Sequence, residues 1–142
     1  PLAEVEAVKA RRWPQMEKVA AGQLATVMRD ELKPNYLTDG PNRGAILDLC
    51  MQMAQDLGPD VFDRQSRALM ERPDQSETLR QARLPALVLC GEDDTLCPLS
   101  RHTLMHDLLE GSTLRVIPKA GHLPTLEQPE VTTKALEAWL TQ

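Results

Sequence analysis

The strongest constraint on the fold is a short, continuous apolar run late in the chain, from Leu84 to Cys90, which Gly91 ends. A run of this length without regular polar alternation is typical of a β-strand that is buried on both faces. Such strands occur in parallel sheets whose two faces are covered by helices. The run therefore predicts an α/β fold for this part of the chain.

The segments that follow complete this pattern. Apolar residues at helical spacing predict a helix over residues 99–109, a second strand is predicted over 113–117, and a last helix over 128–140. The order strand, helix, strand, helix predicts two parallel strands joined by a crossover. Two strands are too few for a stable open sheet. The edges of the pair therefore need strands from a longer protein, or pairing with a second copy of this chain.

The first part of the chain has a different character. Helical spacing of apolar residues recurs there, with Pro14 expected either to kink the first helix or to start a new one. The dipeptide Gly58-Pro59 is expected to end a helix that begins near residue 42. We therefore divide the chain into a helical region, residues 1–80, and an α/β region, residues 81–142.

Net charge argues against two classes of partner. The formal net charge is -5 over 142 residues, whereas a nucleic-acid or anionic-membrane surface requires a basic patch. Lys9, Arg11 and Arg12 come closest to such a patch, but Glu4 and Glu6 precede them on the same predicted helix. Mixed charge of this kind is typical of a solvated helix face. We expect no nucleic-acid partner and no membrane partner.

The cysteines indicate the compartment. The chain contains Cys50, Cys90 and Cys97, an odd number with no C-x-x-C pair, which favours neither a disulfide framework nor a zinc knuckle. No apolar run approaches the ~20 residues that a membrane-spanning helix needs. Reduced thiols are typical of the cytoplasm, so we expect a cytoplasmic protein.

Two ionisable residues follow the two predicted strands. Asp94 lies four residues after Cys90, and His122 lies five residues after Ile117. Binding and catalytic sites of open α/β sheets form outside the carboxyl ends of the strands, and neighbouring strands lie only ~5 Å apart. The two loops can therefore meet, so that a carboxylate there accepts the Nδ1 proton of His122. That arrangement is two-thirds of a nucleophile–histidine–acid triad.

The sequence around these residues resembles a known family. Residues 84–140 are similar to the C-terminal portion of the α/β-hydrolase superfamily, in which a P-x-L-V-L-x-G strand leads into x-x-D-x-x-x-P. A later A-G-H-x-P-x-x-E-x-P pattern leads into the last helix of that family. The matching residues here are Pro85 to Gly91, Asp94, Pro98, Ala120, Gly121, His122, Leu123, Pro124, Glu127 and Pro129. The family spacing selects Asp94, rather than its neighbour Asp93, as the acid.

The resemblance implies an enzymatic activity and a separate role for each of the two residues. It implies a hydrolase of carboxylic esters or lactones, in which His122 acts as general base and then acid while Asp94 orients it.

The sequence has no G-x-S-x-G and begins at Pro1, so we expect a C-terminal half whose nucleophile lies upstream and which is inactive alone. Residues 1–80 would be a helical cap, as in the lactonase- and esterase-like branch. The implied partners are a small ester or lactone and the upstream half. No cofactor and no metal are implied.

Two other readings of the family resemblance remain open. An aspartate nucleophile upstream would make the parent protein a haloalkane dehalogenase or an epoxide hydrolase. A relative that has lost catalysis would instead be a binding module.

Two further patterns could be taken for sites. His102 and His106 have the i, i+4 spacing of a metal-binding pair, but no third ligand is evident, so we expect a solvated helix face. Cys97 is close to Asp94, but it has no nucleophile elbow around it, so we expect no catalytic role for it.

Overall fold

The computed structural model describes residues 1–141, which form two compact units. The first unit contains Pro1, Asn35–Ile46 and the chain from Ser76 onward, and the second contains Leu2–Pro34 and Leu47–Gln75. The segment Asn35–Ile46, which lies within the sequence region 1–80, thus packs with the strands.

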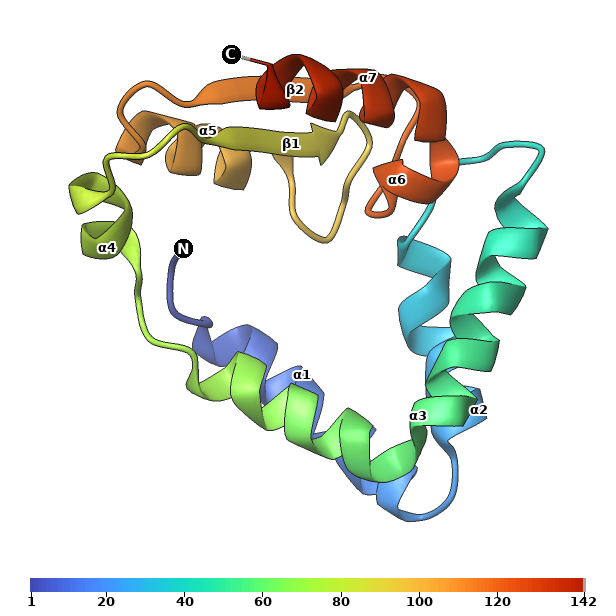
Figure 1. The fold of residues 1–142 in the computed structure, drawn as a ribbon. Helices are drawn as coiled ribbons and strands as arrows, with labels where there is room; N and C mark the ends of the chain where they lie inside the picture. Colours follow the sequence, from blue (N-terminus) through green and yellow to red (C-terminus); the bar gives the residue numbers. More distant parts are fainter. Residues whose placement is uncertain (142) are drawn as a thin grey trace. The chain divides into compact units, whose positions relative to one another are not determined.

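The first unit is built on a pair of parallel strands. Strand β1 (Leu87–Gly91) pairs with β2 (Thr113–Ile117), with Leu87 opposite Thr113 and Gly91 opposite Ile117. Helix α5 (Leu99–Leu108) connects the strands (Figure 1). The predicted α/β class and the parallel crossover are confirmed. Strand β1 begins later than the apolar run, because Pro85 has no N–H to donate to a sheet.

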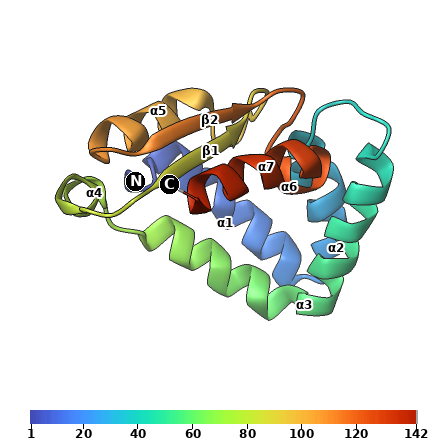
Figure 2. The ribbon, with the colours of Figure 1, turned by 45° about the horizontal axis from the view of Figure 1, so that its top comes forward.

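Helices cover both faces of this strand pair. Helix α5 packs on both strands and α7 (Pro129–Leu140) packs on β2. The two helices lie on opposite faces, as the two ribbon views show (Figures 1 and 2). This explains why β1 is apolar on both sides and why the core of the unit includes Val88, Cys90, Ile117 and Ala120.

Two short helices flank these elements. Helix α4 (Ser76–Gln81) precedes β1. Helix α6 (Pro124–Glu127) lies between the His122 loop and α7, in a segment where the sequence predicted no helix. Pro124 occupies its first turn, where the missing N–H has no cost.

The second unit is helical. Its elements are α1 (Glu6–Ala20), α2 (Leu24–Val27), a π-helical turn η1 (Met28–Leu32) and most of α3 (Arg43–Glu71), with the 3₁₀ turn η2 (Lys33–Asn35) at its border. Helix α1 continues through Pro14 as one element. Helix α3 changes direction at Gly58, whose φ of 77° and ψ of 178° lie outside the helical region and favour glycine. The predicted helix end at Gly58-Pro59 corresponds to this kink.

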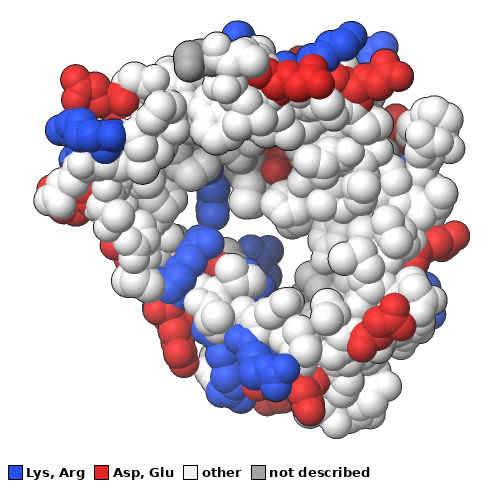
Figure 3. Space-filling view, viewed as in Figure 1, with Lys and Arg blue, Asp and Glu red and all other residues white. Residues whose placement is uncertain are grey.

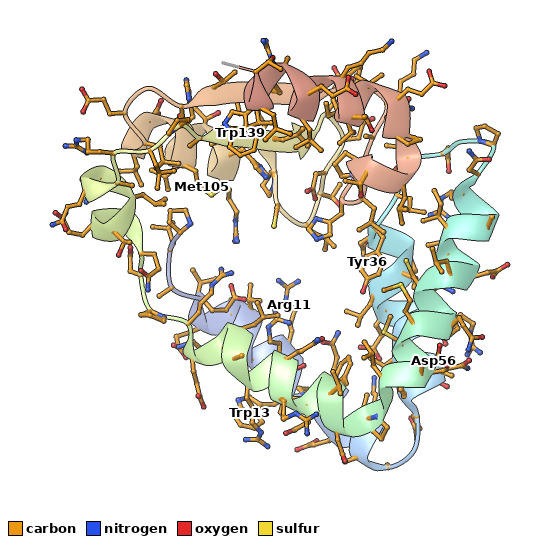
Figure 4. The ribbon with its side chains drawn as sticks, in the orientation of Figure 1. Arg11, Trp13, Tyr36, Asp56, Met105 and Trp139 are labelled. Carbon is orange, nitrogen blue, oxygen red and sulfur yellow. The ribbon has the colours of Figure 1, made fainter. Side chains whose placement is uncertain are left out.

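Polar contacts within the second unit join α1 to the end of α3. The side chain of Glu4 is 4% exposed and accepts hydrogen bonds from Arg12 at 3.0 Å and from Arg72 at 3.5 Å. The guanidinium of Arg67 lies 5.6 Å from the ring centroid of Trp13, which α1 contributes (Figure 4). Acidic and basic side chains lie beside one another on the visible surface (Figure 3), as expected from the mixed charge pattern. Within residues 1–141, no helix is both long and apolar enough to cross a bilayer.

Candidate active site

Asp94 and His122 are brought together at the carboxyl ends of β1 and β2. The Nδ1 atom of His122 lies 2.9 Å from Oδ2 of Asp94. The Asp94 side chain is 5% exposed and that of His122 is 35% exposed, so the pair is open to solvent on the histidine side only. With the carboxylate as acceptor, Nδ1 carries the proton and Nε2 is left as the basic nitrogen.

The second oxygen of Asp94 is held by the main chain of its own turn. Oδ1 accepts hydrogen bonds from the amides of Leu96 at 2.9 Å and Cys97 at 2.8 Å. A buried carboxylate requires such donors, because an unpaired buried charge is costly. These bonds fix the carboxylate so that Oδ2 points at His122. Asp93, the neighbouring acid, is exposed.

Backbone contacts also lock the two loops to each other. The amide of Glu92 donates to the carbonyl of Ile117, and the amide of Asp93 donates to the carbonyl of Ala120, both at 2.9 Å. A Cβ at Gly91 would fall directly on the carbonyl oxygens of Ala120 and Gly121. Only glycine allows the end of β1 to approach the histidine loop this closely.

A distant segment supports the histidine loop from the other side. The amide of His122 donates to the carbonyl of Tyr36 at 2.7 Å, and the rings of these two residues lie 6.4 Å apart between centroids. Tyr36 precedes α3 and is labelled in Figure 4. A Cβ at Gly121 would lie 2.8 Å from the Tyr36 carbonyl oxygen, so glycine is needed there for close approach. The turn itself uses a positive φ of 55° at Lys119.

The side chain of Glu127 strengthens the contact between the histidine loop and the segment that carries Tyr36. Its Oε2 accepts hydrogen bonds from the amides of Gly121 at 2.8 Å and Leu123 at 3.2 Å, the two residues that flank His122. Its Oε1 accepts from the amide of Thr38 at 2.8 Å and from the Thr38 hydroxyl at 3.1 Å. One carboxylate therefore ties the histidine loop to the segment that carries Tyr36. The sequence pattern contained Glu127 but did not indicate this role.

Replacement of Glu127 by glutamine should lower the free energy of unfolding by about 1–3 kcal/mol, because amide donors of the loop lose their acceptor. Urea unfolding followed by circular dichroism measures the change. The control is Glu137→Gln on the exposed side of α7, which should change stability by less than about 0.5 kcal/mol. Equal stability of the two variants would show that the Glu127 contacts contribute nothing to the fold.

The paired histidines of α5 do not form a site. His102 is only 9% exposed and its Nδ1 lies 3.4 Å from the Pro98 carbonyl, so the expectation that it lies on a solvated face was wrong. His106 instead contacts the Ser112 hydroxyl through Nδ1 at 2.8 Å. Helix α5 packs on both strands and on α4, and His102 is its buried residue.

Cys97 lies closer to the site than the sequence indicated. Ligand atoms of Asp94, Cys97 and His122 all lie within 4.8 Å of one another. The turn that binds the Asp94 carboxylate also brings the Cys97 side chain back toward it. Burial raises the pKa of the thiols of Cys50 and Cys90, and the nearby Asp94 charge raises that of Cys90 further.

The chemistry available to this arrangement is proton transfer. Because Asp94 holds Nδ1, the His122 ring is fixed in one orientation and Nε2 can accept a proton from a group in front of it. The carboxylate stabilises the imidazolium that results.

The comparisons with known proteins identify the family. Residues 2–135 match the model described as the alpha/beta hydrolase family, so the chain belongs to the α/β hydrolases. The family resemblance seen in the sequence is thereby confirmed, and the protein is of a hydrolase family.

Three relatives illustrate the similarity. A thermophilic esterase from Thermogutta terrifontis is 28% identical with a TM-score of 0.89, covering 99% of this chain and 52% of that one. The enol-lactonase from Burkholderia xenovorans LB400 shares the fold, with a TM-score of 0.75 at 17% identity over 91% of this chain and 49% of its own. The 2-hydroxy-6-oxo-6-(2'-aminophenyl)hexa-2,4-dienoic acid hydrolase of Metapseudomonas resinovorans is 28% identical over 107 residues, 75% of this chain and 32% of that protein.

The chain spans only part of the length of its relatives. Its matches cover between 21% and 41% of the curated proteins. They cover 52% of the chain of the Thermogutta esterase.

Proposed function

We propose that this chain supplies the acid and the histidine of a catalytic triad in a longer hydrolase of carboxylic esters or lactones. The observation that carries the proposal is the 2.9 Å contact between His122 Nδ1 and Asp94 Oδ2 at the carboxyl ends of adjacent parallel strands. This is where α/β sheets carry their sites.

In this mechanism His122 transfers protons twice. Nε2 takes the proton of the attacking serine hydroxyl as the hydroxyl adds to the substrate carbonyl, and then gives that proton to the leaving oxygen. In the second half, Nε2 takes a proton from the water that attacks the acyl-enzyme, and then gives that proton back to the serine oxygen as the bond to the acid product breaks. Asp94 remains ionised throughout and stabilises the imidazolium.

The nucleophile is placed upstream of Pro1 in this proposal. Two features support a longer protein: the match to about half of the esterase chain, and the two-stranded sheet of the described residues. Apolar side chains on the first unit are also exposed, among them Leu84 at 59% and Val116 at 39%. Strands of the upstream half would pair with the outer edges of β1 and β2, and the rest of that half would cover these side chains. Without a nucleophile or an oxyanion hole, the chain alone should be inactive.

A second copy of this chain, rather than an upstream half, could also pair with the outer edges of β1 and β2. Self-association of the isolated chain would then accompany its folding. Sedimentation velocity distinguishes the two cases, because a strictly monomeric chain would exclude self-association.

The same proposal assigns roles to residues 1–80 and 81–142 and places the protein in the cytoplasm. Residues 1–80 act in this proposal as a cap that selects the substrate, although Asn35–Ile46 and the residues from Ser76 onward pack with the core that residues 81–142 complete. Cys50, Cys90 and Cys97 form no disulfide within the described residues, which fits a protein of the reducing cytoplasm.

The test is expression of the reading frame that extends upstream of this chain. The longer protein should hydrolyse p-nitrophenyl acetate or a small lactone, and the chain of 142 residues should not. A fluorophosphonate probe should label one serine in the longer protein, since an activated serine attacks its phosphorus, expels fluoride and becomes phosphonylated. Absence of both hydrolysis and labelling would overturn the proposal.

An aspartate nucleophile is the alternative, because the acid and histidine here would serve it equally well. In that case the probe would label nothing, while the longer protein would open an epoxide or release halide from a haloalkane. An upstream half with no nucleophile would leave a binding module.

A further inference from the structure

Three side chains with metal-binding atoms converge at the site, and the mechanism above uses two of them. They are the carboxylate of Asp94, the thiol of Cys97 and the imidazole of His122, with ligand atoms within 4.8 Å of one another. We propose that this group is an inhibitory site for Zn²⁺, in which the ion occupies the acid–histidine pair and switches it off. The inhibitory role rests on the function proposed above, whereas the binding does not.

The distances fit a small ion after a modest adjustment. Zinc takes sulfur at ~2.3 Å and nitrogen or oxygen at ~2.0–2.2 Å in tetrahedral sites, so its ligand atoms stand about 3.5 Å apart. The Nδ1–Oδ2 separation of 2.9 Å must therefore open slightly, and the Cys97 sulfur, which lies within 4.8 Å of the other two ligand atoms, must adjust to the same spacing. Cys97 is on the same turn as Asp94, so rotation of its side chain is the main movement required.

The supports of a metal ligand are already in place. Metal-binding carboxylates are themselves hydrogen-bonded, which orients them and raises affinity. Oδ1 of Asp94 accepts from the amides of Leu96 and Cys97, so Oδ2 stays available to an ion. His122 is 35% exposed and Cys97 is partly exposed, which gives the ion a way in and leaves the fourth position to water.

The donor set selects the ion. One nitrogen, one sulfur and one carboxylate oxygen suit zinc and similar transition metals, whereas magnesium and calcium require oxygen ligands. Binding should therefore be unaffected by Mg²⁺.

Zinc at this position removes the base. The ion takes the lone pair of Nδ1, so the single proton of the neutral imidazole resides on Nε2, which can then only donate. The Cys97 thiol loses its proton to solvent as the zinc–sulfur bond forms. The Asp94 carboxylate and the His122 imidazole, which would activate a nucleophile, are thus both bound to the metal. No oxidant or reductant is involved.

The test measures binding without reference to catalysis. The purified chain is titrated with ZnCl₂ by equilibrium dialysis, and the alkylation of each cysteine by iodoacetamide is followed by mass spectrometry. We expect one zinc per chain and protection of Cys97, with the alkylation of Cys50 unchanged. Cys97→Ser should weaken zinc binding by at least ~100-fold, since loss of even an outer-shell partner costs 10–100-fold.

Controls separate this site from other thiols and from unfolding. Cys50→Ser should bind zinc as the original chain does, and MgCl₂ should give no protection. His122→Gln, which removes a second ligand, should also weaken binding while circular dichroism reports an intact fold. Unchanged zinc affinity in Cys97→Ser, or unprotected Cys97, would overturn the site.

The regulatory role is tested in the longer protein. Zinc should inhibit its hydrolysis, and Cys97→Ser should reduce that zinc sensitivity. Zinc that binds at Cys97 without inhibiting an active longer protein would overturn the inhibitory role. Zinc binding by a longer protein with no hydrolase activity would overturn the proposed function and leave the metal site standing.

Discussion

His122→Ala should reduce kcat/KM of the proposed longer hydrolase by on the order of 10⁵-fold, the largest effect of any substitution in this chain. In the proposed mechanism, the alanine removes the group that takes the proton of the nucleophile and that contacts the Asp94 carboxylate. Steady-state hydrolysis of p-nitrophenyl acetate measures the loss. The fold should persist, because His122 joins the loop network through its amide, which alanine retains.

The matched control is His106→Ala, which removes an imidazole that contacts Ser112 and lies on α5. It should retain activity within about threefold, as expected for a residue away from the reacting atoms. An active His122→Ala protein, or equal losses in the two variants, would contradict the assignment of His122 as the base.

Asp94→Asn should reduce kcat by about 10⁴-fold with little change in KM. Asparagine keeps an oxygen for the amides of Leu96 and Cys97, so the turn stays folded. Its NH₂ group, however, faces Nδ1 as a donor and forces the proton onto Nε2, which is the wrong tautomer for a base.

Asp93→Asn provides the matched control, one position away. Asp93 is exposed, and its backbone amide donates a hydrogen bond to the Ala120 carbonyl, which asparagine retains. Activity should therefore stay within about twofold. Loss of activity in Asp93→Asn with retention in Asp94→Asn would exchange the roles of the two acids.

Local pattern predicted much of the α/β region. The apolar run predicted a strand buried on both faces, and its order with the next helix and strand predicted the parallel crossover. The placement of Asp94 and His122 at adjacent strand ends followed from the same order, since parallel strands end at one edge. Their catalytic roles stay a prediction.

Long-range contacts could not be predicted from local pattern. Tyr36 lies in a loop before α3 with no periodicity that points to the histidine loop, and its contribution is a backbone carbonyl, which any residue type has. The role of Glu127 depends on Thr38 and on amides that become its partners only after folding. Proline inside a helix usually kinks or ends it, but in the second unit α1 continues through Pro14 as one element.

The direct contact of Gly91 with the backbone of Ala120 and Gly121 has an evolutionary consequence. No side chain separates the two strand ends, so the distance between acid and histidine is set by main-chain geometry and by two obligatory glycines. Substitutions that accumulate elsewhere in the chain during divergence can leave that distance unchanged. A lineage carrying this chain would therefore keep the spacing of Asp94 and His122 while its other surfaces diverge.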